Sequence, residues 1–262
     1  MKKDHYCERP WNLAHCSARL VSGIMRIAIL LMIAAVAAAQ PSDPTVRIVG
    51  AMKNVMWGGQ LQGTIGLDTI SPREHLYGLG PAEFLRGELL IVDGRSYRST
   101  VAADSTMIVE ETSNARAPFF VYAKVDRWIE RQLPDSIRSL SQFESYLDQI
   151  TASARRPFAF RLTGTVETAM IHIVNLPQGT AVTSPDRAAM GRRDYHLRDQ
   201  SSMIIGFFST EHQGIFTHHD SYVHMHLLTD DHTGMGHVAE ALFKRGTMTL
   251  SLPAESNTSS GP

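Results

Sequence analysis

Short apolar runs bounded by glycine, proline, aspartate and serine dominate this chain and limit the folds open to it. Runs of about four to eight such residues are typical of strands, whereas a helix shows an apolar repeat of three to four. Runs of this kind lie at 106–110, 118–125, 158–162, 169–174, 203–208, 222–228, 237–243 and 247–252. The pattern predicts a strand-dominated α+β protein with mixed or antiparallel sheets and few helices.

Two segments carry the signature of a specific local structure. An apolar run at 89–92 is followed by Asp93-Gly94, the residue types that a two-residue hairpin loop needs. Ser139 can cap a helix, with Gln142 three residues later completing a capping box. Apolar residues then repeat at helical spacing through residue 150. We therefore expect one hairpin at 89–98 and one clear helix after Ser139.

The polar segment 177–200 predicts a long loop, which divides the mature chain near residue 176. The expected parts are an N-terminal β-rich subdomain at 45–176 and a C-terminal metal-binding β subdomain at 177–253. The polar, serine-rich stretch 254–262 predicts a disordered tail.

The N-terminal segment 1–39 resembles a secretory signal peptide with an extension before it. Arg26 precedes an apolar run, 27–39, that ends in three alanines. The run is shorter than the roughly 20 residues of a membrane-spanning helix. Because Met25 directly precedes Arg26, we expect translation to start there and the mature chain to be secreted or periplasmic, without a membrane anchor. An uncleaved anchor is the alternative.

Charge and cysteine content exclude several classes of function. The formal net charge of −1 gives no electrostatic reason to expect nucleic acid as a partner. Cys7 and Cys16 both precede the expected cleavage site. The mature chain would therefore lack cysteine, which excludes thiol catalysis and cysteine-based metal sites.

Histidines are concentrated between residues 212 and 237. In a strand, residues i and i+2 point to the same face, so His224 and His226 should project side by side. The polar segment 229–236 contains two glycines and can turn the chain back, which brings His237 alongside them. Three imidazoles arranged in this way leave a coordination position open and suit zinc or another divalent transition metal. Of the other histidines in this stretch, His218, His219 and His232 are expected at the surface.

The stretch from His224 to Val238 resembles the metal-binding segment of the α-acetolactate decarboxylase family, which has His-x-His, an acidic turn and Gly-Gly-His-Val. The segments 77–80 and 85–94 are similar to the family's glycine-containing strand and the hairpin after it. Segments 158–165 and 204–208 also follow in the expected order, so the resemblance covers about residues 46–253.

The resemblance implies two related β-rich subdomains, a homodimer, and the decarboxylation of the small molecule 2-acetolactate to acetoin and CO2. Loss of CO2 leaves an enediolate, whose charge a Lewis acid stabilises before a proton is added. On this resemblance Glu88 corresponds to the active-site glutamate, and His172 takes the position of an active-site arginine.

Three positions depart from the family pattern. His172 cannot offer the bidentate fork of the arginine that it replaces. Pro81 stands where threonine is usual, and Glu255 lies too close to the last expected strand to replace a C-terminal glutamate of the family. Two alternatives therefore remain beside a decarboxylase: a non-catalytic relative that binds a small hydroxy-keto acid, and an enzyme of different specificity in which His172 is the acid or base.

Overall fold

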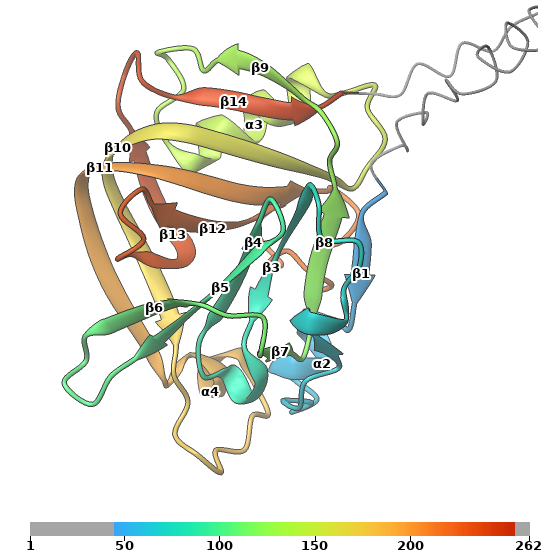
Figure 1. Cartoon of the computed structure of the whole chain (residues 1–262), viewed down its shortest axis with the longest axis vertical. Coiled ribbons are helices and arrows are strands. Elements are labelled where there is room, and N and C mark those ends of the chain that lie inside the picture. Colours follow the sequence, from blue (N-terminus) through green and yellow to red (C-terminus); the bar gives the residue numbers. More distant parts are fainter. Residues whose placement is uncertain (1–44, 255–262) are drawn as a thin grey trace, which may run out of the picture. The chain divides into compact units, whose positions relative to one another are not determined.

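The computed structural model describes residues 45–254, which form two six-stranded sheets with few helices (Figure 1). All pairings within the two sheets are antiparallel, and the predicted fold class is confirmed. The predicted signal peptide, the start at Met25 and the tail from residue 255 lie outside the described residues. No helix within residues 45–254 is long and apolar enough to cross a membrane.

The first sheet has the strand order β1-β8-β3-β4-β5-β6. Its strands are β1 (Arg47–Val49), β3 (Leu76–Pro81), β4 (Glu88–Val92), β5 (Arg95–Val101), β6 (Met107–Glu111) and β8 (Phe120–Lys124). The predicted Asp-Gly hairpin joins β4 to β5, since Val92 pairs with Arg95. Asp93 and Gly94 have φ angles of 46° and 81°, the left-handed conformations that such a tight loop requires.

The second sheet has the order β11-β12-β13-β10-β14-β9. Its strands are β9 (Trp128–Gln132), β10 (Phe158–Val174), β11 (Arg192–Phe208), β12 (Val223–Thr229), β13 (Met235–Phe243) and β14 (Thr249–Pro253). In addition, β10 and β11 pair with each other along their whole length. The strands β10, β11, β12 and β13 therefore close into a ring, and the three histidines of the predicted metal site lie on β12 and β13.

Short elements complete the chain. They are the strands β2 (Ile65–Gly66) and β7 (Arg116–Ala117), the helices α2 (Met52–Met56), α3 (Leu140–Ile150) and α4 (Pro185–Ala189), and two 3-10 turns at Leu67–Thr69 and Glu83–Leu85. The helix α3 is the one predicted, and both hydrogen bonds of its capping box are present. Its residues Phe143 and Leu147 are buried in the core that the second sheet encloses.

The sequence predictions were wrong in two places. The two strands expected at 158–162 and 169–174 are a single strand, β10, which continues through Gly164 at a φ angle of 142°. The segment 177–200, expected as a loop, contains α4 and the first half of β11. This half of β11 is polar because it is largely exposed, and only Tyr195 and Leu197 pack against the core.

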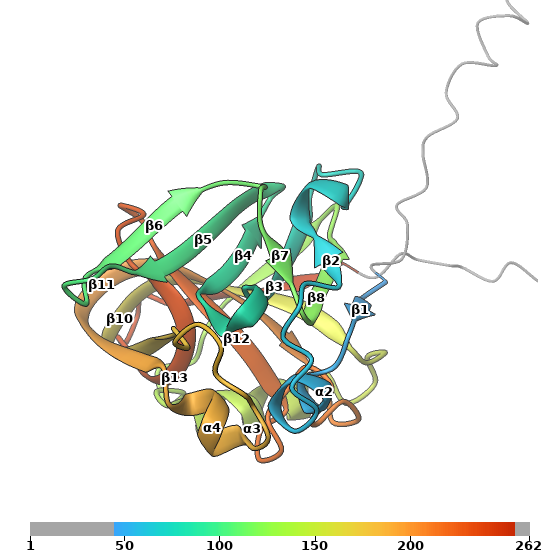
Figure 2. The ribbon, with the colours of Figure 1, turned by 90° about the horizontal axis from the view of Figure 1, so that it is seen from below.

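The two sheets lie against each other (Figure 2), and a shared apolar core fills the space between them. The first sheet contributes Tyr77, Leu79, Leu90 and Val121 among others, and the second contributes Ile205 and Phe207. The first sheet ends at Lys124 and the second begins at Trp128. The expected subdomain boundary near residue 176 stays a prediction. This packing places β4 against β12 and β13, where the candidate site lies.

Candidate metal centre

The strand register brings the three predicted histidines together. His224 and His226 lie on β12, and His237 on β13 stands directly opposite His226. One imidazole nitrogen from each of the three residues lies within 4.8 Å of those from the other two. The turn between β12 and β13 thus brings His237 alongside the other two histidines, as predicted. The buried triad can hold a metal ion.

Burial keeps the three imidazoles neutral. His224, His226 and His237 are 3%, 0% and 8% exposed. Burial, and after it the charges of neighbouring histidines, lowers the pKa of His226 to about 3 and the pKa values of His224 and His237 well below the usual range. Neutral imidazole is the form that binds metal ions, so no proton has to be displaced from the triad near neutral pH.

Two buried nitrogen atoms of the triad have no hydrogen-bond partner within the described residues. His226 Nδ1 donates to the carbonyl oxygen of Leu89 on β4, at 3.0 Å, and its Nε2 is left over. His224 has a backbone hydrogen bond with Phe216, and its Nδ1 is left over. A buried polar atom without a partner is costly unless something binds it. One nitrogen held by the protein and the other free is the arrangement of a histidine that binds a metal.

Glu88 reaches the triad from the other sheet. It is the first residue of β4 and only 3% exposed, and its Oε2 lies 3.6 Å from Nε2 of His226. Its Oε1 accepts a hydrogen bond from the backbone N–H of Val174, at 3.2 Å. Burial raises the pKa of Glu88 to about 8, against the lowering effect of the Val174 bond.

His172 also belongs to this cluster. It lies on β10 opposite His237, and the centroids of the two rings are 4.6 Å apart. Its Nδ1 is buried without a partner among residues 45–254. Burial, followed by the charge of Arg192, lowers the pKa of His172 to about 3. The five residues Glu88, His172, His224, His226 and His237, all predicted from the sequence, are thus brought to one place.

Comparisons with known proteins identify the family. The sequence profile of the family described as alpha-acetolactate decarboxylase matches residues 49–259. The chain belongs to the α-acetolactate decarboxylase family.

Its relatives are distant. The alpha-acetolactate decarboxylase of Brevibacillus brevis is 24% identical over 253 residues, which are 90% of this chain and 84% of that protein. The Streptococcus thermophilus protein of the same name is 23% identical over 213 residues, 77% of this chain and 80% of that one. Among solved structures, acetolactate decarboxylase from Bacillus subtilis subspecies spizizenii superposes with a TM-score of 0.67 at 21% identity, covering 79% of this chain and 85% of that chain. The last likeness establishes the shared fold.

The structure adds one histidine to this family member's site that sequence reasoning missed. His218 was expected at the surface, but it is half-buried and its ring centroid lies 5.2 Å from that of His237. The segment that carries His218 is an irregular loop between β11 and β12. No short-range pattern marks it. His219 and His232 are exposed, as predicted.

Pro81, the second departure from the family pattern, stands beside the site. It is the last residue of β3 and pairs directly with Glu88 across the sheet. Proline has no N–H and no polar side chain, so it offers the carboxyl group of Glu88 no hydrogen-bond donor at this position. The carboxyl group is held instead by the backbone of β10.

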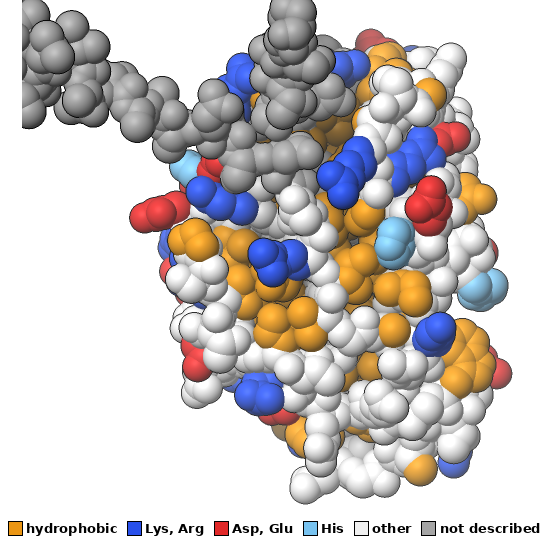
Figure 3. Space-filling view, turned by 90° about the vertical axis from the view of Figure 1, so that its right-hand side faces the viewer, with side chains coloured by type: hydrophobic (Ala, Val, Ile, Leu, Met, Phe, Trp, Pro, Cys, Tyr) orange, Lys and Arg blue, Asp and Glu red, His pale blue; other side chains and the backbone are white. Residues whose placement is uncertain are grey.

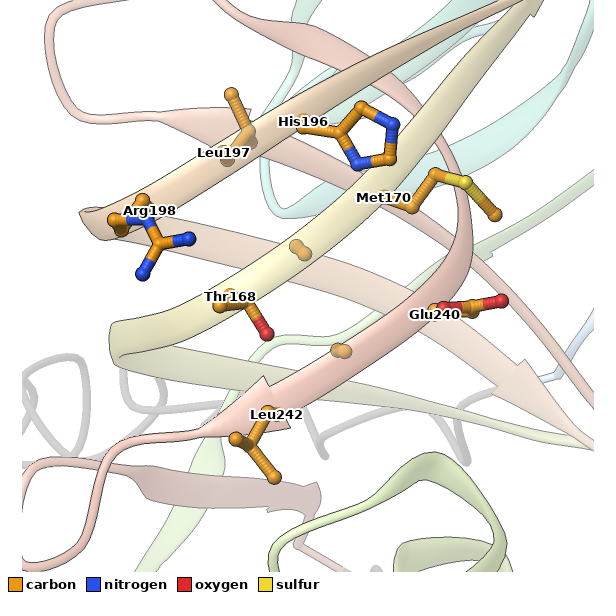
Figure 4. Close-up of a pocket in the computed structure, with 9 residues that line it drawn as sticks. Thr168, Met170, His196, Leu197, Arg198, Glu240 and Leu242 are labelled. Atoms are coloured by element: carbon orange, nitrogen blue, oxygen red, sulfur yellow. The ribbon is translucent and has the colours of Figure 1, made fainter.

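A separate surface hollow of about 350 Å³ lies along β10, β11 and β13, with Met170, His196, Arg198 and Glu240 among its lining residues (Figure 4). None of the five site residues lines it. On another face of the molecule, Lys and Arg side chains are interspersed with acidic and hydrophobic ones (Figure 3). The expected lack of a nucleic-acid partner stays a prediction.

Proposed function

We propose that this protein catalyses the metal-dependent decarboxylation of 2-acetolactate to acetoin and CO2. The observation that carries the proposal is the buried triad, with two imidazole nitrogens lacking a partner and Glu88 beside them, in a chain of the α-acetolactate decarboxylase family. The metal that we propose is zinc or another divalent transition ion, since neutral imidazoles favour these over magnesium or calcium.

His224, His226 and His237 would hold the metal, and the backbone bond of His226 to Leu89 would fix its ring. A divalent ion held there supplies a Lewis acid for negative charge that develops on a ketone oxygen. The surrounding burial excludes water, which strengthens such electrostatic interactions.

Glu88 is the residue that we assign to proton delivery. In the reaction, the bond between C2 and the carboxylate carbon breaks, its electron pair stays on the substrate, and one proton is then added to carbon. Glu88 is the carboxyl group next to the triad, 3.6 Å from His226, and Val174 holds one of its oxygens. The other oxygen faces the site and is free to deliver a proton, which solvent later replaces.

A second candidate is a relative that binds a metal and a small hydroxy-keto acid without decarboxylating it, or that acts on a different one. The observation in its favour is His172, a buried imidazole where the resemblance places an arginine. A neutral imidazole cannot form the bidentate pair with a carboxylate that arginine forms.

The deciding experiment combines metal analysis with an acetoin assay on the purified protein. We expect one divalent ion per chain, acetoin formation from 2-acetolactate, and loss of both in His224→Ala. His232→Ala, an exposed histidine in the β12–β13 turn, is the matched control and should keep both. Stoichiometric metal without acetoin would reject the decarboxylase and favour the second candidate.

Export and self-association remain proposals from the sequence. N-terminal sequencing of exported protein would test cleavage after Ala39, and sedimentation of the purified protein would test the homodimer.

A further inference from the structure

The face of the second sheet that carries the triad also carries Arg192. On antiparallel strands, residues directly opposite each other point to the same face. His172 on β10 is opposite His237 on β13 and opposite Asp194 on β11. Arg192 lies two residues before Asp194 and therefore projects on that face as well. The pairing thus places an arginine diagonally across from His172, at roughly 7–8 Å between the strand positions.

Only part of the Arg192 guanidinium group is hydrogen-bonded within residues 45–254. Its Nε donates to Oδ1 of Asp194 at 2.5 Å, and its two terminal nitrogens have no partner among residues 45–254. The side chain is 34% exposed, so it stands at the boundary between the buried cluster and solvent. The bond to Asp194 restrains the guanidinium group and leaves its outer edge, the part that grips a carboxylate, available.

The charge of Arg192 acts on the cluster. After burial, it is the largest influence that lowers the pKa of His172, against the smaller opposite effect of Asp194. It also contributes to the lowered pKa of His218, after burial, the opposing charge of Asp220 and the charge of His219. Across the described chain, no other Lys or Arg affects the pKa of a histidine in this cluster.

We propose that Arg192 binds the carboxylate of the ligand held at the histidine triad, and so makes the site selective for anionic hydroxy acids. This inference rests on the proposed function for its substrate class. The positive charge that pairs with the carboxylate would then be that of Arg192 on β11, diagonally across from His172. The imidazole of His172 packs against His237. Asp194 is a positioning residue, since it acts through the guanidinium group.

The test compares two probes that differ by the carboxylate. One is 2,3-dihydroxy-2-methylbutanoate, which has no ketone and cannot be decarboxylated in the same way, and the other is neutral butane-2,3-diol. Calorimetric titration of the zinc-loaded protein measures the affinity for each. Arg192→Gln should weaken binding of the carboxylate probe about 10- to 100-fold, the range for a lost charge-assisted hydrogen-bond pair, and leave diol affinity and zinc content unchanged. Arg192→Lys should restore part of the loss, because it keeps the charge but not the fork.

Arg193→Gln is the matched control. Arg193 is the next residue on β11, is exposed and points to the opposite face. It should leave the affinity for both probes unchanged.

Three outcomes would overturn the proposal: no binding of the carboxylate probe by the wild-type protein, unchanged affinity in Arg192→Gln with zinc retained, or an equal loss for both probes. Acetoin formation is measured separately, so carboxylate binding that depends on Arg192 without turnover would reject the decarboxylase and keep this inference.

Discussion

The two ends of the long hairpin formed by β10 and β11 differ sharply. At the end near Phe158 and Phe208, most side chains are buried and apolar. At the other end, Val174 pairs with Arg192 and the outer positions of β11 are charged and exposed. His172, which is buried, and Arg192, which is half-exposed, both lie at this polar end. One pair of strands therefore combines a buried apolar half with a polar, largely exposed half.

The buried end should carry much more of the stability. Phe160 is fully buried, and its ring centroid lies 5.2 Å from that of Phe143. We expect Phe160→Ala to lower the free energy of unfolding by about 3–5 kcal/mol, because it removes buried contacts and leaves a cavity. Urea unfolding measures the difference.

Arg198→Ala at the polar end is the matched substitution, since Arg198 is exposed on β11. It should change the free energy of unfolding by no more than about 0.5 kcal/mol. Equal losses in the free energy of unfolding for the two variants would contradict the larger contribution of the buried end to stability.

Catalysis should depend on Glu88, which the polar end of the hairpin holds through the backbone of Val174. Glu88→Gln keeps the shape of the side chain but removes the acidic proton, so we expect acetoin formation to fall by about 100-fold or more. The fold should persist, because the amide oxygen can still accept the bond from Val174. Initial rates and circular dichroism together measure this. Glu83→Gln, a substitution of a half-buried glutamate in the preceding turn that lies outside the histidine cluster, should leave the rate unchanged.

Metal removal should lower stability less than Phe160→Ala does, and it should act only through the site. A ligand that binds the folded state alone at a hundred times its Kd stabilises it by about 2.7 kcal/mol. Chelation should therefore lower the Tm of the wild-type protein, and zinc should restore it. His237→Ala should show no response to zinc, and a response equal to that of the wild type would argue against the triad as the binding site.

Local rules predicted much of this molecule. The Asp93-Gly94 loop, the capping box at Ser139 and the facing positions of His226 and His237 each follow from neighbours in the sequence. The first half of β11 could not be predicted in this way, because its pairing with β10 rather than its own composition makes it a strand. His218 was missed for a related reason, since a loop without periodicity carries it to His237.

The family resemblance contributed what local rules could not. Nothing in the pattern around Glu88 distinguishes it from an ordinary strand residue, and only the packing of two sheets brings it to His226. The distance between these residues in the sequence is far beyond any periodic pattern.

Each sheet hydrogen-bonds, through its backbone, a buried site residue of the other sheet. The backbone of β10 restrains Glu88 of the first sheet, and the backbone of β4 restrains His226 of the second. The positions of Glu88 and His226 relative to each other are thus set by the packing of the two sheets and not by any loop. Substitutions that change the thickness of the shared core, at residues such as Leu90 and Phe207, would therefore shift Glu88 relative to His226 during evolution. Every site residue could stay the same.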